Sequence, residues 1–282
     1  MEQRQGVERP VRFGTAQLAP APYRERGWLL MVDGVLQSCV DLDDPGYLHL
    51  PYTRWVARVL DLHWPEGDPV SALQVGGGGF TISRYLAHTR PGSAQEVYEL
   101  DGPLVELVRE HLALDAVPGL RVRVEDGEAG IRGTADDAAD VVVMDVARVG
   151  TIALDLAATP FLREIARVLR PGGLYLGNMW SAADLGLALR AVASLTEVFP
   201  HVALLAEPGL LLGRKAGNAV LIASDRALPH RELAEWAEAG GNKVFCLSAA
   251  KLAEFKGTAE PLGTDIPEDS ITPVPRWRTG VS

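Results

Sequence analysis

The chain has 282 residues, of which 47% are apolar and 23% charged, an ordinary composition for a globular protein. Its formal net charge of −10 opposes binding to nucleic-acid phosphates and docking on anionic membranes. Since no apolar run resembles a signal peptide or a membrane span, we expect a cytoplasmic protein that binds neither nucleic acid nor membrane.

Residues 1–64 predict a small N-terminal β-element followed by a linking helix. Two apolar runs, 28–32 and 35–40, flank Asp33-Gly34, a dipeptide that favours a hairpin turn. Residues 47–62 carry apolar side chains at helical spacing. We therefore expect a hairpin that leads into one helix.

Residues 65–260 alternate between strand and helix patterns. Such alternation is typical of a mostly parallel sheet with helices on both faces. The pattern predicts a Rossmann-like α/β domain with a seven-stranded sheet, and residues 261–282 form a Pro-rich tail. The expected strands are 70–75, 95–100, 120–124, 140–144, 174–180, 202–205 and 219–223.

Cysteine and histidine usage predicts no metal site. Cys39 and Cys246 lie far apart, and the six histidines show no metal-binding spacing. We therefore expect neither a disulfide framework nor a bound metal.

Four glycines, 76–79, directly follow the strand at 70–75 and precede a helix pattern. Glycine lets a backbone approach a ligand closely, and a helix N-terminus offers unpaired N–H groups. Acidic residues follow three other strands: Glu99, Asp126 and Asp145. Ligands bind at the carboxyl ends of strands in open α/β sheets, so this pattern predicts a nucleotide or nucleoside site.

The glycine loop lacks the cues for phosphate binding. No Gly-Lys-Ser/Thr follows it, and Thr81 stands where the dinucleotide fingerprint requires its third glycine, which disfavours an NAD-dependent dehydrogenase. Glu99 can still accept both ribose hydroxyls, and Asp126-Gly127 can meet the adenine amino group or form an ordinary turn. This combination suits a phosphate-free nucleoside such as S-adenosylmethionine.

Seven motifs in order and spacing make the chain resemble the spermidine synthase superfamily, the polyamine aminopropyltransferases. They are MVDGVLQ, DDPGY, LQVGGGG, YELDGPLVEL, VEDGEA, VVVMD and FLREIARVLRPGGLYL, between about residues 30 and 176. The last is shared with methyltransferases of the same fold. The resemblance implies an S-adenosylmethionine-dependent methyltransferase fold, a small-molecule acceptor, and a homodimer or homotetramer.

The resemblance also implies roles for single residues. S-adenosylmethionine or decarboxylated S-adenosylmethionine would be the co-substrate, without a metal. Asp145 would accept a proton from the attacking amine or orient it, because an amine must be neutral to attack. Tyr47 would lie at the active centre. The residues expected to contact the donor are Gln37, Gly76, Gly77, Gly78, Glu99, Asp126 and Gly127.

Two departures from the family pattern concern the substrates. Gly79 stands where the family has an Asp that meets the donor ammonium, and Arg148 replaces an Asp that holds the polyamine. Replacing a negative side chain by a positive one here turns attraction to a polyamine ammonium into repulsion. At a separation of 4 Å and an effective dielectric of 20, this changes the electrostatic interaction energy by roughly 8 kcal/mol before solvent screening. Arg148 either faces an acidic substrate or is a surface arginine.

Three functions therefore remain open from the sequence. The first is aminopropyl transfer to an acceptor other than putrescine, and the second is methyl transfer to a small molecule. The third is a catalytically inactive protein that binds an adenosyl compound or a partner.

Overall fold

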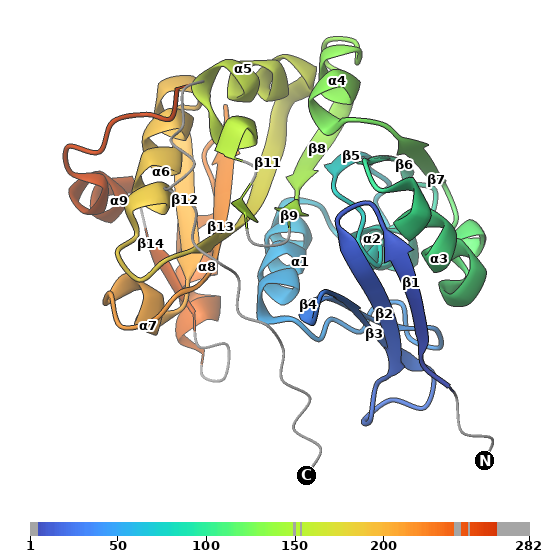
Figure 1. Ribbon diagram of the computed structural model, residues 1–282. Coiled ribbons are helices and arrows are strands. Elements are labelled where there is room, and N and C mark those ends of the chain that lie inside the picture. Colours follow the sequence, from blue (N-terminus) through green and yellow to red (C-terminus); the bar gives the residue numbers. More distant parts are fainter. Residues whose placement is uncertain (1–4, 149–150, 153, 240–243, 248, 264–282) are drawn as a thin grey trace.

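The computed structural model describes residues 5–148, 151–152, 154–239, 244–247 and 249–263 (Figure 1). Within these residues the strands form a four-stranded antiparallel sheet, an eight-stranded mixed sheet and a two-stranded hairpin. The tail expected at 261–282 lies outside the described residues from position 264 onward.

The N-terminal sheet is built by four consecutive strands. They are β1 (Val7–Val11), β2 (Gly14–Pro20), β3 (Gly27–Val32) and β4 (Val35–Asp41). The hairpin expected at Asp33-Gly34 is present, and both turn residues have positive φ. Leu30 pairs with Ser38 while Met31 pairs with Leu36, so Gln37 is the extra residue of a β-bulge.

The large sheet has the strand order β14-β12-β13-β11-β8-β5-β6-β7. Pairing is parallel from β11 through β8, β5 and β6 to β7, and antiparallel on the β13 side, which confirms the predicted fold class. The strands are β5 (Ser71–Val75), β6 (Ala94–Glu99), β7 (Leu120–Val124), β8 (Ala139–Met144), β11 (Leu169–Ser181), β12 (His201–Ala206), β13 (Gly217–Ser224) and β14 (Phe245–Leu247).

The sheet differs from the seven expected strands by the edge strand β14. Its three residues are too few to show an alternating pattern, and they become a strand by pairing with β12, where Leu247 lies opposite Leu204. Only the tertiary contact therefore reveals this strand.

Helix α1 begins at Pro51, four residues later than the sequence pattern suggested. Proline at the first helical position suits a start there, and Leu50 before it is extended. Tyr47 consequently lies in the loop before α1. The α-helices are α1 (Pro51–His63), α2 (Thr81–Thr89), α3 (Gly102–Leu112), α4 (Gly127–Arg132), α5 (Thr159–Val168), α6 (Gly186–Val198), α7 (Pro208–Leu211), α8 (His230–Glu238) and α9 (Ala249–Lys256).

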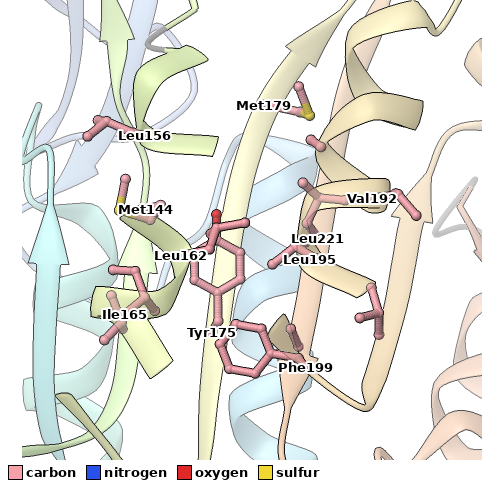
Figure 2. Close-up of a cluster of buried hydrophobic side chains, with 14 of the residues drawn as sticks. Met144, Leu156, Leu162, Ile165, Tyr175, Met179, Val192, Leu195, Phe199 and Leu221 are labelled. Atoms are coloured by element: carbon pink, nitrogen blue, oxygen red, sulfur yellow. The ribbon is translucent and has the colours of Figure 1, made fainter. Parts of the chain in front are cut away.

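Hydrophobic clusters cover both faces of the large sheet. Alternate residues of β8 point to opposite faces, as in a strand buried on both sides: Val141 and Val143 pack with α1, whereas Val142 and Met144 pack with α5 and α6. Figure 2 shows the cluster on the face covered by α5 and α6, which includes Met144 and Tyr175. Since α1 packs on the large sheet, the predicted boundary at residue 64 stays a prediction.

In the described ranges no helix is long and apolar enough to cross a membrane. The same residues contain no group of three His, Cys, Asp or Glu side chains placed to hold a metal ion.

Candidate active site

The predicted site residues gather at one edge of the large sheet. Strands β8, β5, β6 and β7 are neighbours and run parallel, so their carboxyl ends lie side by side (Figure 1). Asp145 follows β8, Gly76 follows β5, Glu99 ends β6 and Asp126 lies just beyond β7. Four signals that are distant in the sequence thus lie along one edge of the sheet.

Gly76 brings the glycine loop against the backbone of Asp145. Its φ is +88°, and a Cβ there would lie 2.2 Å from the carbonyl oxygen of Asp145. The amide of Gly76 donates to the Tyr98 carbonyl, and the amide of Asp145 donates to the Val75 carbonyl, each at 2.9 Å. Glycine is therefore required at position 76, and Asp145 is rigidly joined to the loop.

Glu99 orders the glycine loop with its carboxylate. Oε2 accepts from the amides of Gly77 (2.7 Å) and Gly78 (3.4 Å), while Oε1 accepts from the amide of Asp101 (2.9 Å). These bonds to an ionised acceptor are stronger than neutral ones. A carboxylate has about four lone-pair directions, so Glu99 can hold the loop and accept further hydroxyl donors.

Asp126 and Gly127 open helix α4 at the same edge. Asp126 is exposed, and its Oδ1 caps the helix by accepting from the amide of Ala129 at 3.0 Å. A Cβ on Gly127 would lie 2.2 Å from Val75 Cγ1, so glycine permits close packing here. Val124, 54% exposed, lies nearby in the chain and adds apolar surface suited to an aromatic base.

Asp145 carries the strongest chemical signal of the site. Its Oδ2 accepts from the Tyr52 hydroxyl at 3.0 Å, and its Oδ1 accepts from Asn178 Nδ2 at 2.9 Å. Burial raises the pKa of Asp145 above its usual range, while these two hydrogen bonds act in the opposite direction. A carboxylate with a raised pKa accepts a proton more readily, which suits a general base.

Asn178 has an unsatisfied acceptor beside this carboxylate. Its Oδ1 is buried and has no hydrogen-bond partner among the described residues. Leaving a buried acceptor unpaired is costly, so a ligand that brings an N–H or O–H group would satisfy it. The unpaired Oδ1 of Asn178 thus lies next to the amide nitrogen that donates to Asp145.

Sequence reasoning did not find Tyr52 or Asn178. Tyr52 lies 93 residues from Asp145 in the chain, and both its helix and its burial are those of an ordinary core residue. Asn178 comes from the end of β11. The one available signal for a role of Asn178 was that it is a polar residue within the apolar run of that strand.

Gln37 and Tyr47 make different contacts from those of the Asp145 group. Gln37 donates from Nε2 to the Val35 carbonyl at 3.3 Å. The Tyr47 hydroxyl is hydrogen-bonded to His49 Nδ1 at 3.2 Å, and the Arg24 guanidinium lies 4.3 Å from its ring centroid. The roles implied for Gln37 and Tyr47 stay predictions.

Strand β4 reaches the glycine loop through Ser38. Ser38 Oγ accepts from the amide of Gly79 at 2.9 Å, and a Cβ on Gly79 would lie 2.7 Å from Ser38 Cβ. The family's Asp therefore has no space at position 79. Arg148 ends strand β9 (Ala147–Arg148), and its side chain lies outside the described residues, so its substrate role stays a prediction.

Comparison with known proteins agrees with this architecture. The family model described as a methyltransferase domain matches residues 73–177. The crystal structure of a probable spermidine synthase from Corynebacterium glutamicum has a TM-score of 0.85 at 28% identity, covering 93% of this chain and 97% of that one.

Two curated relatives match over part of their length. The polyamine aminopropyltransferase of Chromobacterium violaceum is 27% identical over 146 residues, 52% of this chain and 55% of that protein. Putrescine N-methyltransferase 2 of Nicotiana tabacum is 28% identical over 156 residues, 52% of this chain and 41% of that protein. The chain thus matches about half the length of these relatives. With the fold and the ordered motifs, these matches support a spermidine synthase-like superfamily member, at modest sequence identity.

Proposed function

We propose that this protein is a transferase that alkylates the nitrogen of a small amine, with an adenosyl sulfonium compound as donor. The observation that carries the proposal is Asp145, with a raised pKa, joined to the glycine loop and facing Asn178. The relatives named for aminopropyl and methyl transfer to amines support the same reaction class.

The residues at the sheet edge fit an adenosyl donor. Glu99 would accept the ribose hydroxyls, and Asp126 would meet the adenine amino group over the apolar surface of Val124. Gly78 would leave room for the sugar, because a Cβ there would meet only Ser38 Oγ, at 3.1 Å. The donor supplies an electrophilic carbon bound to positively charged sulfur.

The reaction balances with the residues of this site. The amine lone pair forms a bond to the carbon, the carbon–sulfur bond breaks, and its electron pair stays on sulfur as a neutral thioether. The nitrogen then carries one proton too many, and Asp145 accepts it. Tyr52 and Asn178 hold the carboxylate in place through their hydrogen bonds.

Replacing the carboxylate tests the proposal. Asp145→Asn keeps the shape of the side chain but removes the base, so kcat should fall by about 10²- to 10⁴-fold. Donor affinity, measured by calorimetric titration, should change less than twofold. Asp68→Asn, at an exposed position, is the control and should keep full activity. Unchanged turnover in Asp145→Asn would leave Asp145 a structural role and favour another base.

Methyl transfer is the second candidate because of the packing at Gly79. A Cβ on Gly79 would lie 2.7 Å from Ser38 Cβ, so this position is packed against β4 and lacks the Asp that the family uses to meet the ammonium of the decarboxylated donor. Incubation with each donor and mass spectrometry of the products decides between them: methylthioadenosine marks aminopropyl transfer, and S-adenosylhomocysteine marks methyl transfer. If neither donor binds tighter than about 1 mM, roughly −4 kcal/mol, the transferase proposal is wrong.

A further inference from the structure

A small cavity lies beside Asp145, on the other face of the large sheet. Met144 and Val146, the two chain neighbours of Asp145, both line it, whereas Asp145 itself bonds to Tyr52 of α1 on the opposite face. Asn178 also lines the cavity and donates to Asp145. The cavity and the proposed amine position therefore share one wall.

The lining of this cavity is apolar. Its volume is about 40 Å³. Since about 10–15 Å³ of such volume holds one water-sized group, it has room for a chain of roughly three atoms. The described residues around it include no Asp, Glu, Lys, Arg or His; they are Met144, Val146, Leu156, Ala157, Met179 and Leu221, with Gly177, Asn178 and Tyr175.

Tyr175 is the one aromatic residue among the described residues that line the cavity. Its side chain is buried and stacks on Phe199, and burial raises the pKa of its hydroxyl, which therefore stays neutral. Figure 2 shows the hydroxyl pointing toward the side that carries Leu156 and Met179. Gly177 makes space for that hydroxyl, because a Cβ there would lie 2.4 Å from the oxygen.

We infer that the cavity receives a short, uncharged alkyl group on the acceptor amine, so that the acceptor is an alkyl monoamine rather than a diamine. This inference rests on the proposed function. The nitrogen would lie at Asp145 and Asn178, and about three carbons of the alkyl chain would lie among Met144, Leu156 and Met179. A second ammonium in that space would lose its water and meet no carboxylate in the lining.

Calorimetric titration of the protein saturated with methylthioadenosine tests this inference. We expect n-butylamine to bind at least tenfold tighter than 1,4-diaminobutane, and affinity to rise from methylamine to n-butylamine and then level off. Equal or tighter binding of the diamine, or no dependence on chain length, would overturn the inference.

Two variants change the size of the cavity in opposite directions. Ala157→Leu fills it, and should weaken n-butylamine at least tenfold while methylamine is unaffected. Leu156→Ala enlarges it, and should move the optimum toward n-hexylamine. Ala253→Leu, at an exposed position of α9, is the matched control and should change neither affinity. If both cavity variants bind the series as the unmodified protein does, the cavity is not the alkyl site.

The same titrations separate this inference from the proposed function. If neither donor nor methylthioadenosine binds, the proposed function fails, and the amine series is titrated against the protein alone. Chain-length dependence that Ala157→Leu abolishes then still supports the cavity as an alkylamine site. Loss of that dependence in the unmodified protein overturns it.

Discussion

At the scale of single residues, the tyrosine beside Asp145 is one of two hydrogen-bond donors that lower the pKa of the proposed base. The Tyr52 hydroxyl donates to Oδ2 and stabilises the carboxylate, against the burial that raises its pKa. The pKa of Tyr52 itself lies well above its usual range because of burial and the neighbouring carboxylate, so it remains a donor. The two groups therefore act as one unit.

Tyr52→Phe should move the acidic limb of the rate profile to higher pH. The active form of Asp145 is the carboxylate, so activity falls as the pH drops through its pKa. Removing the hydroxyl removes a bond to the charged form, which raises the pKa further. Profiles of kcat/KM against pH for both proteins measure this shift. A limb that moves to lower pH, or does not move, contradicts the hydrogen bond as a determinant of that pKa.

At the scale of elements, strand β4 packs closely against the glycine loop. The Ser38 hydroxyl of β4 accepts a hydrogen bond from the loop, and Gly79 has no side chain to keep the two apart. The amide of Gly79 donates to Ser38 Oγ. A Cβ on Gly79 would lie 2.9 Å from Val40 Cγ2, so the absence of a side chain allows the close approach. The N-terminal sheet thus forms part of the support of the site. This contact ties the two sheets at the donor loop.

Gly79→Ala should destabilise the fold by about 1–3 kcal/mol through overpacking against β4. Chemical denaturation measures the change, and Gly263→Ala, with no atom of the described residues within 4 Å of its Cβ, should stay within about 0.5 kcal/mol. Because Ser38 is the nearer of the two clashing partners, the other being Val40, Gly79→Ala combined with Ser38→Gly should cost less than the sum of the two single changes. Strict additivity would show that β4 and the loop do not press on each other.

At the scale of the whole molecule, an adenosyl ligand should stabilise the protein because its site joins four strand ends and the loop held by β4. At 100 times its Kd the ligand adds about 2.7 kcal/mol. For a chain of this size that corresponds to a rise in Tm of roughly 5–10 °C. Thermal scans with and without S-adenosylmethionine or methylthioadenosine measure it.

The same thermal scans on the variant Glu99→Ala test whether Glu99 contributes to ligand binding. The variant removes the proposed ribose acceptor and the bonds to Gly77 and Gly78, so the Tm rise should disappear at the same ligand concentration. An undiminished rise would place the adenosyl group elsewhere. The homodimer or homotetramer implied by the family stays a prediction at this scale, to be measured by light scattering.

Several features of the site could be predicted because they depend on local chemistry. The glycines 76–79 and the acids Glu99, Asp126 and Asp145 each lie at or just beyond the end of a strand, and parallel strands necessarily bring their carboxyl ends to one edge. The spacing of apolar residues predicted the main strands because this pattern, too, is local in the sequence. The predicted start of α1 at residue 47 was wrong, because the helical spacing of apolar residues continues into the loop that carries Tyr47. The helix itself begins at Pro51.

The amino-acid sequence by itself determined the α/β class, the glycine loop and the row of acidic strand ends, since alternation, glycine and capping preferences act over a few residues. The tertiary structure alone decided that Tyr52 and Asn178 hold Asp145, that Ser38 excludes an acidic side chain at position 79, and that an apolar cavity adjoins the site. Those contacts join residues tens of positions apart, and no local pattern encodes which buried side chains will meet.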